Sequence, residues 1–181
     1  DIRWGAQQIA PGDVLLVSGT LGDHGATILN LREQLGLDGA LASDCAVLTP
    51  LIQTLRAVPG IKALRDATRG GVNAVAHEFA AASGCGIELH EQKLPVNETV
   101  RGVCELLGLE ALNFANEGKL VIAVAREAAE AALAQLQSHP LGRHAAIIGD
   151  VVERTGVRTI GLYGVKRTLD LPHAEPLPRI C

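Results

Sequence analysis

The sequence predicts an α+β fold, layered like an α/β protein, with helices packed on a mixed β-sheet. Short apolar runs typical of strands alternate with segments whose apolar residues recur at helical spacing. The last two strand-like runs are joined by only four residues, 153–156, which favours an antiparallel hairpin and therefore a mixed sheet. A length of 181 residues suits one domain of ordinary size.

The first half of the chain is predicted to contain three strands and three helices. Pro11-Gly12-Asp13 reads as a turn before the first apolar run. Asp44 is the expected N-cap of the second helix, since its side chain can accept from free backbone N–H groups. The predicted strands cover 14–18, 61–67 and 86–89, and the predicted helices include Ile28 to Leu35, 44–56 and Val72 to Phe79.

The second half is predicted to continue the same alternation. Asn97 is the expected N-cap of a helix over 97–107. A strand over 119–125 is followed by an alanine-rich helix over 126–137, and two strands over 145–152 and 157–162 complete the domain.

Composition excludes several classes of protein. Apolar residues make up 48% of the chain and charged residues 20%, as in a globular domain, and aromatic residues are only 2%. The net charge is −4 and the basic residues are scattered, which argues against a nucleic-acid surface. No apolar run approaches the roughly 18 residues that span a bilayer, and no signal peptide opens the sequence. Because methionine is absent, we expect a fragment or a processed piece.

The four cysteines separate into three expected core residues and one outlier. Cys45, Cys85 and Cys104 each lie among regularly spaced apolar residues, so each is interpreted as a small buried hydrophobe. No spacing suggests a metal site or a disulfide framework, which favours a reducing cytoplasm. Cys181 is left over, at the end of a tail that contains Pro172, Pro176 and Pro178.

The tail is predicted to be an extended arm, because proline fixes φ and removes a hydrogen-bond donor. At roughly 3.1 Å per residue, the residues from Asp170 onward could reach about 35 Å. Such an arm could deliver a sulfur atom to a site built elsewhere. The alternative is a frayed terminus with an incidental thiol.

Two internal motifs contain candidate functional residues. Asp66-Ala-Thr-Arg-Gly-Gly71 falls where a strand ends and a helix begins, a position at which free N–H groups favour anions. Its glycines let a phosphate approach the backbone, Arg69 adds a charged fork, and Asp66 is placed to hold Mg²⁺. Asn113-Phe-Ala-Asn-Glu-Gly-Lys-Leu120 precedes another strand, and its Glu117 could act as a general base. Either motif could also be a plain turn.

These motifs resemble a known family. Ser18–Gly25, Asp66–Gly71, Ala115–Lys119, Ile148-Gly149 and the ending Pro178-Arg-Ile-Cys181 occur in order along nearly the whole chain. Together they are similar to the C-terminal domain of the carbamoyl dehydratases of hydrogenase maturation, the HypE family of the aminoimidazole ribonucleotide synthetase superfamily. Selenophosphate synthetase and thiamine-monophosphate kinase resemble the scaffold but lack the terminal cysteine arm.

The resemblance implies a reaction and a set of residues. A carbamoyl group held on Cys181 as an S-carboxamide would be dehydrated at the expense of ATP to a thiocyanate, which supplies cyanide ligands to nickel–iron hydrogenase. Glu117 would remove the amide protons. Nucleotide binding would involve Asp66, which would also hold Mg²⁺, together with Thr68, Arg69, Gly70, Gly71 and Asn116.

The resemblance also implies partners and domain boundaries. The carbamoyltransferase HypF would donate the carbamoyl group, the HypC–HypD complex would accept the cyano group, and the full-length protein would be a homodimer. Residues 1–10 would be a linker from an N-terminal ATP-binding domain, 11–168 the C-terminal α/β domain and 169–181 the mobile tail. Because the N-terminal domain supplies most of the ATP site in such proteins, this chain alone is expected to bind ATP poorly and to be inactive.

Two alternatives stay open at this point. The chain could be a non-catalytic docking module whose tail is a peptide ligand for a partner. It could also be a kinase or synthetase cousin that acts on a small molecule.

Overall fold

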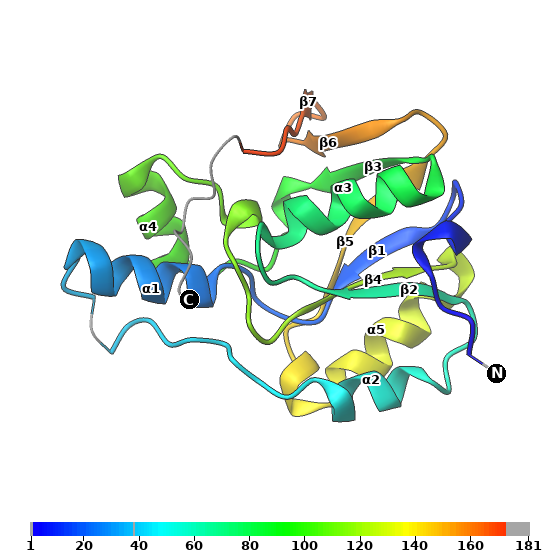
Figure 1. Cartoon of the computed structure of the whole chain (residues 1–181), viewed down its shortest axis with the longest axis horizontal. Coiled ribbons are helices and arrows are strands. Elements are labelled where there is room, and N and C mark those ends of the chain that lie inside the picture. The colour runs from blue at the N-terminus through cyan, green and yellow to red at the C-terminus, as the bar shows by residue number, and fades with distance from the viewer. Residues whose placement is uncertain (1, 38, 173–181) are drawn as a thin grey trace.

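A single mixed sheet between two layers of helices forms the body of the molecule (Figure 1). The computed structural model describes residues 2–37 and 39–172. Within those residues the strands are β1 (Val14–Val17), β2 (Ile61–Asp66), β3 (Gly86–His90), β4 (Leu120–Val124), β5 (Ala146–Val152), β6 (Gly156–Ile160) and β7 (Lys166–Thr168). The α-helices are α1 (Asp23–Glu33), α2 (Thr49–Leu55), α3 (Gly71–Ser83), α4 (Glu98–Leu107) and α5 (Ala129–Gln137). Short 3-10 helices are η1 (Ala6–Gln8), η2 (Glu91–Lys93), η3 (Ala111–Asn113), η4 (Arg126–Ala128) and η5 (Pro140–Gly142).

The seven strands lie in the order β2-β4-β1-β5-β3-β6-β7. All neighbouring pairs are antiparallel except β3 and β6, which run parallel. The predicted α+β class with a mixed sheet is therefore confirmed. The predicted strands and helices are all present, most with ends within two residues of the expected positions.

The central strands are buried on both faces, which explains their continuous apolar runs. In β1, Leu15 and Val17 contact the core under α3, whereas Val14 and Leu16 contact the core under α2 and α5. Successive side chains of a strand point to opposite faces, so four residues supply both cores. Figure 1 shows α3 on one side of the sheet and α2 with α5 on the other.

A third apolar cluster joins α1 and α4 beyond one end of the sheet (Figure 1). Phe114 is fully buried at its centre. Gly25 in α1 allows this contact, because a Cβ on Gly25 would lie 2.8 Å from the Cβ of Phe114. The aromatic ring thus fixes the loop before β4 against the start of α1.

The predicted hairpin between the last two large strands is wrong. β5 and β6 do not pair; β3 lies between them, antiparallel to β5 and parallel to β6. The short connection from β5 to β6 instead passes the start of β3 at Gly86, where an added Cβ would lie 1.6 Å from the carbonyl oxygen of Arg154. A short loop therefore indicated closeness in space but not direct pairing.

The prediction for Asp44 and Cys45 is also wrong. Helix α2 begins at Thr49, five residues after Asp44, and carries Pro50 in its first turn. Cys45 is exposed, whereas Cys85 and Cys104 are buried as expected. Asn97 does stand at the N-cap of α4, but its side chain makes no capping bond. Its amide donates instead to Asp23 Oδ1, at 2.7 Å.

Residues near both predicted domain boundaries pack on the body. In the range interpreted as a linker, η1 precedes Ile9, which is 4% exposed, and the Gly5 N–H donates to Lys62 O. In the range interpreted as the tail, Leu169 is 4% exposed and belongs to the core under α3. None of the helices in the described ranges is long and apolar enough to cross a membrane.

Candidate functional site

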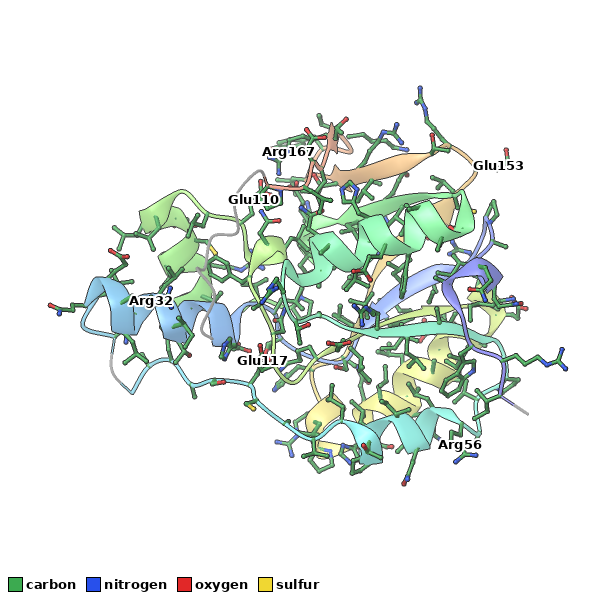
Figure 2. All side chains as sticks on the ribbon, in the orientation of Figure 1. Arg32, Arg56, Glu110, Glu117, Glu153 and Arg167 are labelled. Atoms are coloured by element: carbon green, nitrogen blue, oxygen red, sulfur yellow. The ribbon has the colours of Figure 1, made fainter. Side chains whose placement is uncertain are left out.

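Three loops meet at one end of the sheet. Strands β1 and β2 both pair antiparallel with β4, so their carboxyl ends lie beside the start of β4. The Ser18 N–H donates to Leu120 O, and the Ala67 N–H donates to Lys119 O. The structure therefore brings together the loop after β1, the turn over 66–71 and the loop before β4, which contains Glu117 (labelled in Figure 2).

The turn over 66–71 has the backbone geometry of a tight strand-to-helix connection. Gly70 and Gly71 have φ angles of 75° and 61°, which residues with a Cβ adopt rarely. A Cβ on Gly71 would lie 2.4 Å from Leu112 O, so this position accepts glycine alone. Helix α3 begins at Gly71 and has no side-chain cap. Its first N–H groups remain the local source of positive potential.

The side chains of this turn are half open to solvent. Asp66 has a side-chain exposure of 44% and receives hydrogen bonds from Thr68 Oγ1 at 2.9 Å and Arg65 Nη1 at 3.1 Å. Arg65 also pairs with Glu78, and this contact raises the pKa of the Arg65 guanidinium. Arg69 is exposed on the same turn. The turn thus offers one carboxylate, one hydroxyl and one arginine at the surface.

Asn116 holds the three loops together from inside. It is 1% exposed, and its Oδ1 accepts from Gly22 N–H at 2.8 Å. Its Nδ2 donates to Ala67 O at 3.0 Å and Phe114 O at 2.9 Å. Each polar atom of this side chain therefore has a backbone partner, one from each of the three loops.

Glu117 projects from a loop that a buried ion pair holds in place. Its side chain is exposed, while its N–H donates to Asp44 Oδ1 at 3.0 Å. Asp44 Oδ2 accepts from Lys119 Nζ at 2.8 Å, with side-chain exposures of 4% and 10%. Gly118 passes so close to this segment that a Cβ would lie 1.9 Å from Asp44 O. Asp44 is therefore a site residue that sequence reasoning missed, because nothing local relates it to a loop 73 residues away.

A cleft of about 630 Å³ opens beside the ion pair. It is lined on one side by Asp44 and Lys119 and on the other by Asp23, whose carboxylate receives the Asn97 amide and the Thr20 hydroxyl. The cleft is largely polar and combines acidic groups with one lysine. Such a surface can orient a polar substrate next to the Glu117 loop.

A cation at the 66–71 turn could be held by Asp66 together with oxygen atoms of a bound ligand. No group of three or more histidine, cysteine, aspartate or glutamate side chains suits a metal within residues 2–37 and 39–172. Asp66 is the one carboxylate in its turn. Mg²⁺ is commonly held by one or two carboxylates together with phosphate oxygens and water, and a single exposed Asp66 fits that pattern.

The described cysteines differ in burial. Cys104 lies against α1, and burial of the thiol raises its pKa, with Arg101 offsetting part of the effect. Cys85 is buried, and Cys45 is the exposed thiol of the described part. The predicted carrier Cys181 lies outside the described residues.

A separate charged cluster lies at the opposite end of the sheet. Asp150 contacts His90 Nε2 and Arg126 Nη2, each at 2.6 Å. Burial acts to raise the pKa of Asp150, but the hydrogen bonds from His90 and Arg126 outweigh it and lower the pKa below its usual value. Asp150 pairs with Val14, at the start of β1, so this cluster is distant from the three loops.

Comparison with known proteins identifies similar molecules. Residues 10–161 match the family described as AIR synthase related protein, C-terminal domain. The carbamoyl dehydratase HypE of Escherichia coli (strain K12) is 82% identical over 181 residues, which cover 100% of this chain and 54% of that protein. The chain thus spans about half the length of this relative.

Two solved structures of similar proteins contain a partner or a nucleotide. A HypE–HypF complex is 44% identical with a TM-score of 0.91, and the match covers 94% of this chain and 56% of that chain. A structure of HypE in complex with ATP is 39% identical with a TM-score of 0.90, and the match covers 96% of this chain and 54% of that chain.

Proposed function

Because the chain belongs to the family of AIR synthase related proteins, C-terminal domain, we propose that it is the C-terminal half of an ATP-dependent carbamoyl dehydratase. The observation that carries this proposal is the 82% identity to a carbamoyl dehydratase HypE, which extends over all 181 residues. The enzyme would convert an S-carboxamide on Cys181 into a thiocyanate, the source of cyanide ligands in nickel–iron hydrogenase maturation.

The proposed reaction removes one water from the carboxamide. The amide oxygen attacks the γ-phosphorus of ATP and displaces ADP, while one N–H proton is lost. The second N–H proton then leaves, the C–O bond breaks to release phosphate, and a C≡N bond forms on the sulfur. ATP is consumed because phosphate is a good leaving group and hydroxide is a poor one.

Glu117 is the proposed base for these protons. Its carboxylate is exposed on a loop whose backbone is fixed by the Asp44 carboxylate and by the close passage of Gly118. A fixed loop favours catalysis by a base, because the base must lie within hydrogen-bonding distance of the proton that it removes. In this proposal Asn116 contributes indirectly, because its buried amide connects the three loops of the site.

The turn over 66–71 is the proposed contact to the nucleotide phosphates. Gly70 and Gly71 bring bare backbone to the surface at the start of α3, and Thr68 and Arg69 add polar groups. Asp66 would hold Mg²⁺, which would neutralise phosphate charge. The ATP complex of a HypE relative supports this assignment of the nucleotide.

A solved structure of a relative supports one of the proposed partners. The HypE–HypF complex supports HypF as carbamoyl donor, and we extend the proposal to the HypC–HypD complex as cyano acceptor. The complete protein would be a cytoplasmic homodimer that binds neither nucleic acid nor membrane.

Intact-mass measurement on the complete enzyme tests the proposal. After incubation with the carbamoyltransferase, the wild type should gain one carbamoyl group, and after addition of ATP it should lose one water. Cys181→Ala should abolish both changes. Glu117→Gln should take up the carbamoyl group and fail to lose water, because the amide cannot accept the protons.

Cys45→Ala is the matched control, since Cys45 is the exposed thiol of the described residues, and it should behave as the wild type. A carbamoyl group that still appears on Cys181→Ala would contradict the carrier role. If tail deletion weakens partner binding while Cys181→Ala still supports hydrogenase maturation, the chain is instead a docking module.

A further inference from the structure

The last described segment of the chain is fastened to helix α3 by consecutive carbonyl groups. Leu169 is buried in the core, and its N–H donates to Val157 O at 3.0 Å. Leu169 O accepts from His77 Nε2 at 2.8 Å, and Asp170 O accepts from Asn73 Nδ2 at 2.9 Å. A carbonyl oxygen can only accept, so both side chains present a donor to this segment.

Asn73 connects this segment to the candidate site as well. It is 0% exposed and lies in the first turn of α3, two residues after Gly71. The same Nδ2 donates its second hydrogen to Asn113 Oδ1, at 2.8 Å, just before the loop that contains Asn116. One buried amide thus joins the 66–71 turn, the loop before β4 and Asp170.

The segment after Asp170 is stiff at its first step. Leu171 precedes Pro172, so its backbone is restricted to extended conformations, and the proline ring fixes the next φ. The backbone conformation of Leu171 and Pro172, the last described residues, is therefore restricted. The preceding strand β7 is itself tied down, because Arg167 Nη2 lies 2.8 Å from Glu110 Oε1 (Figure 2).

From these contacts we propose that Asn73 and His77 are positioning residues for the carrier cysteine. They hold Leu169 and Asp170, where the arm begins, and orient the arm toward the 66–71 turn. This inference rests on the proposed function, in which Cys181 must travel between a donor enzyme and the ATP site. Eleven residues, 171–181, separate the anchor from the thiol. At about 3.1 Å per residue they could reach roughly 34 Å.

The anchor acts through direction rather than length. Releasing Leu169 and Asp170 would lengthen an eleven-residue arm by only two residues. The effective concentration of the thiol at the ATP site falls with about the −3/2 power of the length of the arm. The added length alone therefore predicts that this concentration falls by less than about 1.5-fold. Loss of the fixed direction of the arm should have a larger effect. We expect the rate of water loss to fall at least about threefold, which corresponds to part of the free energy of one buried hydrogen bond.

Single-turnover measurements on the complete enzyme separate the loading of the carbamoyl group onto the arm from the later loss of water. The protein is first loaded by the carbamoyltransferase, ATP is then added, and loss of water is followed by intact mass. His77→Ala should load at the wild-type rate and lose water at least about threefold more slowly. His77→Gln, whose amide nitrogen can replace Nε2 as donor, should recover the wild-type rate.

Amide hydrogen exchange supplies a readout of the anchor that does not depend on activity. The Leu169 amide should exchange faster in His77→Ala and in Asn73→Ala, and His77→Gln should restore protection. The proposal is overturned if exchange rises while water loss keeps its wild-type rate, or if loading and water loss slow equally. Failure of the proposed function is distinguishable, because the wild type itself would then take up no carbamoyl group on Cys181.

Discussion

The Asp44–Lys119 ion pair holds the loop that contains Glu117 in place within the candidate site. Both groups are nearly buried, and Asp44 also accepts the Glu117 N–H. Removing one partner of a buried ion pair leaves an uncompensated charge in a poorly solvated place. A surface pair such as Arg65–Glu78, whose side chains are about half exposed, has far less effect on stability.

These two pairs yield a prediction at the scale of single residues. Asp44→Ala should lower the free energy of unfolding of this chain by about 3–5 kcal/mol, because Lys119 loses its partner. Asp44→Asn should cost less, since its amide oxygen can still accept from Glu117 N–H. Glu78→Ala should cost less than about 1 kcal/mol. Urea unfolding measures all three, and equal losses for Asp44→Ala and Glu78→Ala would contradict the assignment.

Among the elements, the connection from β5 to β6 depends on a glycine in a neighbouring strand. Gly86 opens β3 and pairs with Val152 on one side and Gly156 on the other. The chain passes so close that Arg154 O occupies the place of a side chain at Gly86. The parallel pairing of β3 with β6, the one parallel pair of the described sheet, therefore relies on the missing Cβ.

Two alanine substitutions test this account of the sheet. Gly86→Ala should destabilise the chain by about 3 kcal/mol or more, because either the connection or the strand must move. Gly102 lies exposed within α4, where a Cβ would meet no other atom within 4 Å. Gly102→Ala should therefore stabilise the chain by about 0.5–1 kcal/mol. Thermal unfolding of both variants tests these two expectations. A Gly86→Ala protein as stable as the wild type would contradict the close passage of the β5–β6 connection at Gly86.

At the scale of the whole molecule, the proposed function gives this chain one half of a nucleotide site. Its contribution is a glycine turn, the start of one helix and the half-exposed Asp66, and it covers 54% of the length of the E. coli relative. In the proposal, these groups contact phosphates, and the N-terminal half of the complete enzyme supplies most of the other nucleotide contacts. Affinity from so few contacts should be low.

Isothermal titration calorimetry with Mg²⁺ and ATP checks this expectation. The 181-residue chain alone should bind with a dissociation constant weaker than about 0.1 mM, which corresponds to less than about 5.5 kcal/mol of binding free energy. The complete enzyme is the control and should bind more tightly under the same conditions. Micromolar binding by the chain alone would show that the site is already complete here.

Local sequence patterns predicted most of the strands and helices and two motifs of the candidate site. The four-residue apolar run of β1 and the helical spacing of Val72, Val75 and Phe79 were enough to place a strand and a helix. The glycine pair at 70 and 71 predicted a tight turn, and both residues have positive φ angles. Such inferences succeed because burial and backbone sterics act over a few neighbouring residues.

The same patterns were misleading where the structure depends on contacts between residues far apart in the sequence. Asp44 was interpreted as a helix cap because a short acceptor preceded an apolar stripe, yet its partners are Glu117 and Lys119. Cys45 shared that stripe and is exposed, because the helix begins later, at Thr49. The choice between local and distant partners depends on which segments the sheet brings together.

By itself, the amino-acid sequence determined the α+β class, the glycine turn at 66–71 and the burial of Cys85 and Cys104, because each depends on composition and spacing along a few turns. Only the tertiary structure decided that β3 separates β5 from β6, that Asp44 supports the Glu117 loop and that Asn73 and His77 hold Leu169 and Asp170. Those contacts join residues 73 to 97 positions apart, and strand order rather than local preference brings them within hydrogen-bonding distance.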